Sequence, residues 1–304
     1  MGTRDRLHPS IASVVEGIDV TISPENLPLM RMEFPVELSD RVTRTDHLVP
    51  GMPPVEVRAH RPTRAEEPQP GLVWIHGGGY VLGNHRNDDA MFDDLCPRLG
   101  MVAVSIGYRL APETPYPGAI DDCYQALRWT FAHAEELGIR PDRIGIGGLS
   151  AGGGLAAALA LLARDRGEVP VAFQMLDSPM LDDRQITASS QQDDMPLWSR
   201  DANRFGWESY LGSLHGSSEV PYTAAPARAD DLSGLPPAFV SVGGLDGFCD
   251  EDVDYAMRLN RAGVPTELHV YPGACHGYLI ASDSPITIQA ARDRDDWLAR
   301  QLRP

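Results

Sequence analysis

Short apolar runs and helical repeats alternate along most of the chain. Apolar or alternating segments predict strands at residues 55–60, 72–75, 102–106, 144–146, 171–176, 238–242 and 268–271. Apolar residues at helical spacing predict helices over residues 119–137, 155–163, 253–259 and 287–302. Because strands and helices alternate, the pattern predicts an α/β fold: a mostly parallel sheet with helices on both faces.

Two regions interrupt this alternation. Residues 1–45 show little strand pattern, and residues 180–230 carry charged and aromatic helical stretches. Long inserts in a compact domain usually serve as lids or binding segments, so we interpret both regions as parts of one helical cap. Residues 46–179 and 231–304 then form the catalytic domain. A second independent domain is the less favoured alternative, because each piece alone is too small to build a core.

The charge and composition narrow the class of protein. The 304 residues carry a net charge of −17, which argues against nucleic acid or an anionic membrane as a partner. No window approaches eighteen consecutive apolar residues, and the first residues lack the apolar stretch of a secretory signal, so we expect neither a membrane span nor a leader. The chain contains no lysine. This excludes hydrolases with a catalytic lysine, Schiff-base enzymes and P-loop proteins.

The four cysteines are far apart in the sequence. Cys96, Cys123, Cys249 and Cys275 form no C-x-x-C pair. This spacing is typical of reduced thiols in a cytoplasmic protein and favours neither a disulfide framework nor a zinc site. We therefore expect a cytoplasmic protein with no metal and no cofactor.

A serine lies between two glycines where a predicted strand meets a predicted helix. The motif Gly148-Leu149-Ser150-Ala151-Gly152 follows the strand at 144–146 and precedes the helix at 155–163. This G-x-S-x-G pattern is typical of a nucleophile elbow, in which a strained turn exposes the serine hydroxyl. An ordinary N-cap serine is the alternative, but it would not need glycine on both sides.

A second glycine motif follows an earlier strand. His76-Gly77-Gly78-Gly79 comes directly after the run at 72–75. Glycines without Cβ atoms let backbone N–H groups approach a developing oxyanion closely. We therefore assign an oxyanion hole to Gly78 and Gly79 together with the N–H of Ala151, and Gly77 is a further candidate. We expect His76 to order this loop by hydrogen bonding.

The candidate base and the candidate acid each follow a predicted strand later in the chain. His276 follows the strand at 268–271 through a short loop, which suits a base that must reach Ser150. Asp246 follows the strand at 238–242 and lies between Ser150 and His276 in the chain, the order Ser, acid, His. Asp177, after the strand at 171–176, is the second choice for the acid.

Several motifs together resemble the hormone-sensitive-lipase-like carboxylesterases, bacterial family IV of the α/β-hydrolases. They are the His-Gly-Gly-Gly segment, Tyr108-Arg109-Leu110-Ala111-Pro112-Glu113, the serine elbow, and the segment from Leu245 to Tyr278, and they span roughly residues 50–300. The resemblance implies an eight-stranded sheet with a helical cap, a Ser150–Asp246–His276 triad, short acyl substrates and frequent dimers. The aromatic stretch from Trp198 to Tyr210 also resembles the family.

Three positions depart from the family pattern. Leu149 precedes the serine, where many relatives carry Asp, Glu or Thr; Asp177-Ser178 precedes Pro179, where an apolar or aromatic residue is common; and Phe248-Cys249 replaces a leucine–arginine pair. None of these changes removes a catalytic atom, so they bear on substrate range. We expect Leu149, Trp198, Phe205, Phe248 and Tyr278 to line the substrate pocket.

The sequence therefore predicts a carboxylesterase that acts on small esters through a covalent acyl-enzyme. An amidase, lactonase or deacetylase with the same triad is the first alternative. A non-catalytic ligand-binding protein on the same fold is the second, and the complete set of Ser150, Asp246 and His276 weighs against it. Because the resemblance implies frequent dimers, a homodimer is the candidate assembly.

Overall fold

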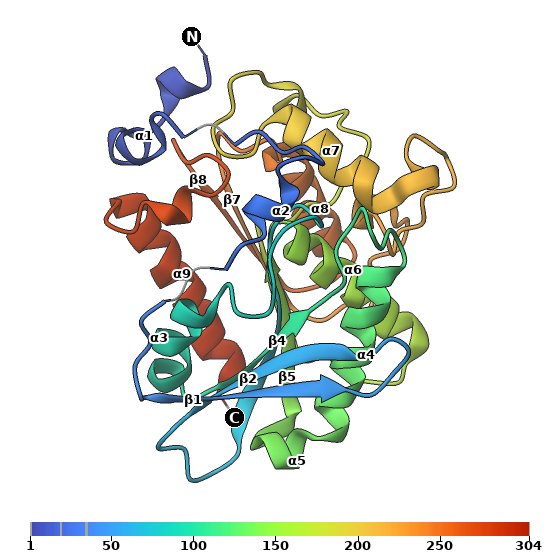
Figure 1. Cartoon of the computed structure of the whole chain (residues 1–304). Helices are drawn as coiled ribbons and strands as arrows, with labels where there is room; N and C mark the ends of the chain where they lie inside the picture. Colours follow the sequence, from blue (N-terminus) through green and yellow to red (C-terminus); the bar gives the residue numbers. More distant parts are fainter. Residues whose placement is uncertain (1, 19, 34–35, 304) are drawn as a thin grey trace.

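The fold is built on one twisted sheet of eight strands, seen in a computed structural model that describes residues 2–18, 20–33 and 36–303 (Figure 1). The strands are β1 (Val42–Val49), β2 (Val55–Pro62), β3 (Gln69–Ile75), β4 (Val102–Gly107), β5 (Ile139–Leu149), β6 (Gln174–Asp177), β7 (Ala238–Gly243) and β8 (Thr266–Tyr271). Their order is β1-β2-β4-β3-β5-β6-β7-β8. Only the β1–β2 and β2–β4 pairs are antiparallel, so the predicted α/β-hydrolase fold with a mostly parallel sheet is confirmed.

Helices lie before, between and after these strands. They are α1 (Pro9–Val15), α2 (Leu27–Met30), α3 (Asp89–Leu99), α4 (Gly118–Ala132), α5 (Ala134–Leu137), α6 (Ala151–Arg166), α7 (Arg200–Leu211), α8 (Cys249–Arg261) and α9 (Pro285–Leu302). Short 3₁₀ turns lie at η1 (Arg4–Arg6), η2 (Ser189–Gln191), η3 (Gly212–Leu214), η4 (Pro226–Arg228) and η5 (Tyr278–Ile280). Among the described residues, no helix is both long enough and apolar enough to cross a membrane.

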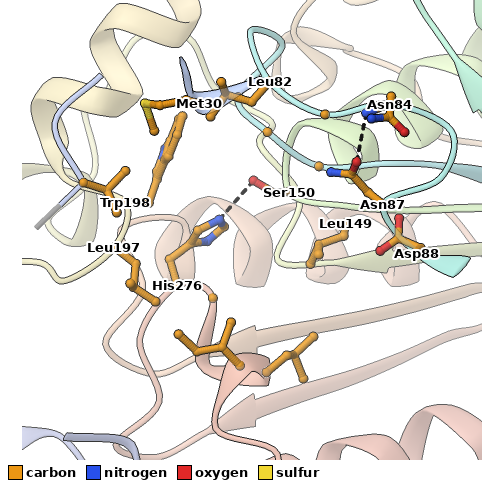
Figure 2. Close-up of a pocket in the computed structure, with 18 of the residues that line it drawn as sticks. Met30, Leu82, Asn84, Asn87, Asp88, Leu149, Ser150, Leu197, Trp198 and His276 are labelled. Atoms are coloured by element: carbon orange, nitrogen blue, oxygen red, sulfur yellow. Dashed lines mark hydrogen bonds between the residues drawn. The ribbon is translucent and has the colours of Figure 1, made fainter. Parts of the chain in front are cut away.

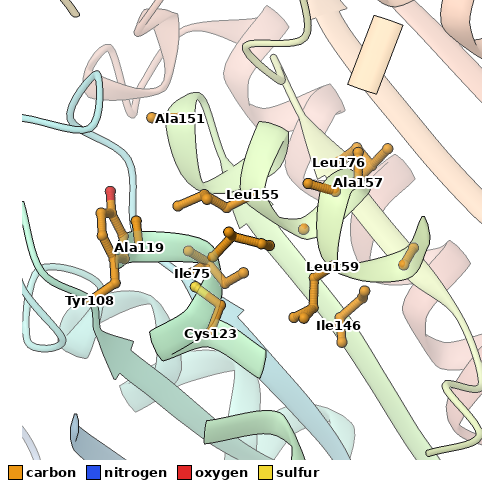
Figure 3. Close-up of a cluster of buried hydrophobic side chains, with 14 of the residues drawn as sticks. Ile75, Tyr108, Ala119, Cys123, Ile146, Ala151, Leu155, Ala157, Leu159 and Leu176 are labelled. Atoms are coloured by element: carbon orange, nitrogen blue, oxygen red, sulfur yellow. The ribbon is translucent and has the colours of Figure 1, made fainter. Parts of the chain in front are cut away.

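Alternate residues of the central strand β3 contact different helices, as the period of two requires. On β3, Leu72 and Trp74 pack into a cluster with residues of α3 and α9, whereas Val73 and Ile75 pack into a cluster with residues of α4, α6 and α8. Figure 3 shows part of the second cluster, in which leucines and alanines of α6 lie over the sheet. Because both faces are covered, the central strands read as continuous apolar runs in the sequence.

Several elements differ from the prediction. One strand, β1, begins inside residues 1–45, where we predicted little strand pattern. Its sequence signal is weak because it is an outer strand whose buried residues lie only at its two ends. α3 was not predicted, and its sequence contains Pro97, a residue that usually ends a helix. The predicted helix 119–137 is divided at His133 into α4 and α5, and the strand predicted at 171–176 is confined to Gln174–Asp177.

The two segments predicted to form the cap contact each other. Thr3 Oγ1 donates to Gln192 Oε1 at 3.0 Å, and Arg4 forms an ion pair with Asp194 at 2.8 Å. In Figure 1, α1, α2 and α7 lie toward the same end of the molecule. The division into a catalytic domain (46–179 and 231–304) and a cap (1–45 and 180–230) stays a prediction, and residues 1, 19, 34 and 35 of the cap lie outside the described residues.

The chain order places two loops at the centre of one sheet edge. The chain passes from β3 outward to β4 and then returns to the other side of β3 as β5. The carboxyl ends of β3 and β5 are therefore neighbours at the point where the direction of winding reverses. In open α/β sheets this is where ligands bind.

Candidate active site

Ser150 occupies a strained turn between β5 and α6. Its backbone has φ of 58° and ψ of −120°, a conformation that L-residues rarely adopt. A Cβ on Gly148 would lie 2.2 Å from the Gly152 carbonyl oxygen, and a Cβ on Gly152 would lie 2.0 Å from the Ile75 carbonyl oxygen. Both flanking glycines are therefore required by the close approach of backbone atoms, and the turn holds the Ser150 side chain out at the end of the strand.

His276 connects the serine to a buried carboxyl group. Its Nε2 lies 3.0 Å from Ser150 Oγ, and its Nδ1 lies 2.7 Å from Asp246 Oδ2. Asp246 is 1% exposed, and its other oxygen accepts the N–H of Phe248 at 3.0 Å. The Phe248 ring stands edge-on to the imidazole, with the ring centroids 4.9 Å apart. The structure thus brings together the three side chains that the sequence proposed as a triad, and a carboxylate in this position holds the imidazole with Nε2 free to accept the serine proton.

Asp177, the second choice for the acid, lies nearby but contacts other groups. Its Oδ1 accepts the hydroxyl of Ser241 at 3.1 Å, and its backbone carbonyl accepts the N–H of Ser150 at 2.8 Å. Burial raises the pKa of the Asp177 carboxyl. The geometry therefore favours Asp246 as the partner of His276 and gives Asp177 a role in fixing the elbow through its backbone.

Backbone N–H groups converge beside Ser150. The N–H groups of Gly78 and Gly79 donate to no acceptor among the described residues, and the Gly78 carbonyl accepts from Val81 and Leu82. Ala151 begins α6, so its N–H has no acceptor within the helix. A Cβ on Gly79 would lie 2.0 Å from Trp198 Cη2. Free donors at a helix start and on a glycine loop are what an oxyanion hole needs.

His76 orders this loop. Its Nδ1 lies 2.8 Å from the Gly77 carbonyl oxygen, and its ring stacks on Tyr108 with centroids 4.2 Å apart. Tyr108 in turn donates its hydroxyl hydrogen to the His76 carbonyl at 3.1 Å. Burial lowers the pKa of His76 to about 4. A neutral ring donating to Gly77 shapes the turn and is a poor candidate for the base.

Ser150 and His276 open onto a cavity of about 610 Å³. Figure 2 shows its wall. The glycine loop, the elbow and the loop after β8 form the inner side, and the N-terminal segment closes the outer side. The lining residues outside the triad and the glycine loop include Val20, Ile22, Met30, Met32, Val36, Leu82, Asn84, Asn87, Asp88, Leu149, Ser178, Leu197, Trp198, Tyr278, Leu279 and Ile280.

Three of the five residues predicted for the pocket line it: Leu149, Trp198 and Tyr278. Phe205 does not, because it is half-buried on α7 and packs against the main core cluster. Phe248 does not either; its ring is 1% exposed and supports His276 from behind. The aromatic residues of these segments are buried near the site, as predicted. The sequence pattern did not distinguish residues that line the cavity from residues that pack behind the catalytic side chains.

The sequence reasoning missed the N-terminal lining and the polar lining at 84–88. Val20, Ile22 and Met30 belong to a segment whose one helix, α2, has four residues and gives no periodic signal. Asn84, Asn87 and Asp88 lie between the glycine loop and α3. Their position directly after the His-Gly-Gly-Gly motif was the available signal. Among residues 2–18, 20–33 and 36–303, no three metal-binding side chains gather.

Comparison with known proteins assigns the family. A family model described as alpha/beta hydrolase fold matches residues 72–280. The chain belongs to this family. It is 38% identical to "Carboxylesterase NlhH" of Mycobacterium tuberculosis over 259 residues, covering 84% of this chain and 78% of that protein. "Esterase LipI" of the same organism is 37% identical over 219 residues, 72% of this chain and 68% of the relative.

Solved structures agree. "Bacterial Heroin Esterase" superposes with a TM-score of 0.93 at 39% identity, covering 99% of this chain and all of that one. The esterase LipW from Mycobacterium marinum superposes with a TM-score of 0.88 at 34% identity, covering 99% and 98% of the two chains. The resemblance to hormone-sensitive-lipase-like carboxylesterases, predicted from the motifs, is confirmed.

Proposed function

We propose that the chain is a serine carboxylesterase that hydrolyses short-chain acyl esters through an acyl-enzyme on Ser150. The observation that carries this proposal is the continuous connection Ser150 Oγ–His276 Nε2–Asp246 at 3.0 and 2.7 Å, next to the free N–H groups of the glycine loop. The esterase names of its relatives support the same chemistry.

The reaction follows from the positions of the groups. His276 takes the Ser150 proton as Oγ attacks the ester carbonyl, and the N–H groups of Gly78, Gly79 and Ala151 hold the oxyanion, with Gly77 as a further donor. His276 then passes the proton to the leaving alcohol, and the acyl group remains on Ser150. Water, deprotonated by His276, attacks the acyl-enzyme and releases the acid. Asp246 stabilises the imidazolium in both steps.

The cap boundaries, a cytoplasmic location and a homodimer remain part of the proposal. Four free thiols support the reducing location. β8 is one of the two outer strands of the sheet, and its outer edge is where a second copy of this chain would pair. The short-chain preference rests on Trp198, which packs against Gly79 and is 8% exposed.

A series of p-nitrophenyl esters from acetate to palmitate tests the proposal. We expect the highest kcat/KM for acetate to hexanoate and no hydrolysis by Ser150→Ala, with an unchanged unfolding temperature. Hydrolysis of matched anilides or lactones in place of esters would favour the amidase or lactonase alternative. Failure of the wild-type protein on the whole series would favour a ligand-binding protein.

A further inference from the structure

The cavity has two unlike arms on either side of Ser150. Figure 2 shows Met30, Leu197 and Trp198 on one side of the serine and Asn84, Asn87 and Asp88 on the other, beyond Leu149. The first arm is apolar. The second combines an apolar wall with amide and carboxyl groups, and the esterase chemistry described above does not use them.

Asp88 is turned away from the helix that it precedes. It occupies the N-cap position of α3 (Asp89–Leu99), yet its side chain makes no capping hydrogen bond. An aspartate at an N-cap normally accepts from the N–H groups of the first turn. Instead, Asp88 Oδ2 accepts the indole N–H of Trp74 at 2.6 Å, and Oδ1 accepts no hydrogen bond from the described residues.

Trp74 fixes the carboxyl group at the floor of the polar arm. The Trp74 side chain is 2% exposed on β3 and pairs in register with Gly147 of β5. Gly147 and Leu149 point to the same face of the sheet, because side chains alternate along a strand. Gly147 lies three residues before Ser150, roughly 10 Å along the strand. The Asp88 carboxyl, held by the Trp74 side chain, lines the same cavity as Ser150 and lies beyond Leu149 in Figure 2.

Among the described residues, no cationic side chain forms an ion pair with Asp88. Two arginines line the cavity, and both pair elsewhere: Arg31 with Glu113 at 2.8 Å and Arg86 with Asp46 at 3.1 Å. In the described part of the chain, no arginine or histidine lies within ion-pair distance of the Asp88 carboxyl. A half-buried carboxylate without a counter-ion is unfavourable, and a ligand cation would relieve that cost.

The ionisation of Asp88 fits this role. Burial raises its pKa to about 6, the Trp74 indole N–H opposes this rise, and the neighbouring Asp89 carboxylate adds to it. At pH 8 the group is therefore mainly ionised and carries the charge that an ammonium ion needs.

Given the proposed esterase function, we propose that the polar arm binds a protonated amino group of the substrate. The preferred substrates are then esters with a tertiary or quaternary ammonium group about three carbon atoms from the ester oxygen. Asp88 supplies the anion, Leu149 contacts the intervening methylene groups, and Trp74 orients the carboxyl group.

Two esters of equal shape test this inference at about pH 8: 3-(dimethylamino)propyl acetate, which is cationic, and 4-methylpentyl acetate, its neutral counterpart. We expect the wild-type enzyme to favour the cationic ester roughly tenfold in kcat/KM, the factor that one partly buried ion pair of about 1.4 kcal/mol supplies. In Asp88→Asn the ratio falls to about one. Asp88→Ser, another N-cap residue, replaces this variant if it does not fold.

A control variant separates local from general effects of charge. Asp94→Asn removes a carboxylate from the same helix, where its side chain is 57% exposed and pairs with Arg98. We expect Asp94→Asn to keep the wild-type ratio. If either ester is turned over too slowly, its inhibition of p-nitrophenyl acetate hydrolysis gives the same ratio from inhibition constants.

The outcomes distinguish this inference from the proposed function. A wild-type ratio near one, or a cation preference that persists without the Asp88 carboxylate, would overturn the inference while leaving the esterase intact. A wild-type protein that hydrolyses neither these esters nor p-nitrophenyl acetate would overturn the proposed function itself.

Discussion

The inner and outer walls of the cavity differ in how they are held. The inner wall, with Gly79, Ser150 and His276, stands on the ends of β3, β5 and β8. Its turns have no room for side chains at the elbow, because a Cβ on Gly148 or Gly152 would lie 2.2 or 2.0 Å from a backbone carbonyl oxygen. The outer wall comes from residues between 20 and 33 together with Val36, and Met32 and Val36 are 55% and 59% exposed. The difference teaches that the sheet positions the reacting groups, whereas a segment with little regular structure determines the shape of the cavity that receives the substrate.

The largest expected effect tests the inner wall at Asp246. Asp246→Asn should lower kcat by about 10³–10⁴-fold, because an amide cannot hold the imidazole in the required tautomer. Stopped-flow or steady-state assays with p-nitrophenyl acetate measure it. Asp250→Asn, which alters a carboxyl hydrogen-bonded to the Ser189 N–H, is the matched control and should change kcat less than threefold. Equal losses of kcat in Asp246→Asn and Asp250→Asn would show that Asp246 has no special role beside His276.

A second variant tests whether the elbow excludes a side chain at residue 152. Gly152→Ala should lower the unfolding free energy by about 3 kcal/mol and activity by about 100-fold, because the new Cβ meets the Ile75 carbonyl and displaces the turn. Gly167→Ala, at the end of α6, meets no atom within 4 Å and should cost only about 1 kcal/mol for its positive φ. Urea unfolding measures both. Similar costs would show that the turn can relax.

A third variant loosens the outer wall alone. Arg31 donates to the carbonyls of Val81 and Ala111 at 2.8 and 2.7 Å and pairs with Glu113, so it ties the end of α2 to the loops that follow β3 and β4. Arg31→Ala should raise KM for butyrate about three- to tenfold and leave kcat within twofold. A fall in kcat as large as that of Gly152→Ala would mean that the two walls are not separable.

The smallest effect concerns stability beneath the inner wall. Asp252 on α8 is fully buried, and neither of its oxygens has a hydrogen-bond partner among the described residues. Burial raises its pKa well above the usual value. The folded protein therefore holds a proton that the unfolded chain releases above about pH 4, so this group lowers stability as the pH rises toward its folded pKa.

Asp252→Asn should remove this penalty. We expect a gain of about 1–2 kcal/mol at pH 8 and a smaller gain at pH 5, measured by urea unfolding at both values. An equal difference between variant and wild type at the two pH values would show that Asp252 does not titrate in this way.

The contrast between the walls also explains what the sequence could predict. Ser150, Gly77–Gly79 and His276 carry strong local signals, since glycine is required where backbones touch and the catalytic loops follow apolar strands. Their meeting in space follows from the order of parallel strands. These parts of the fold and of the site could therefore be predicted from the sequence.

The residues of the outer wall could not be predicted from the sequence in this way. Met30 and Asp88 line the cavity because of tertiary contacts, an arginine clamp and an indole hydrogen bond, that leave no period in the sequence. Phe248 shows the converse case: its aromatic character suggested a lining residue, but packing turned it behind His276. Local pattern predicts which residues are buried near a site better than which of them face the cavity.

Covalent labelling of the nucleophile tests the central claim most directly. Incubation with a p-nitrophenyl alkylphosphonate should attach one phosphonyl group to each chain, and peptide mass spectrometry should locate it on Ser150. Labelling should stop in Ser150→Ala and become much slower in His276→Ala, because the hydroxyl then has no base. A phosphonyl group on another residue, or labelling at the wild-type rate without the imidazole, would contradict the account.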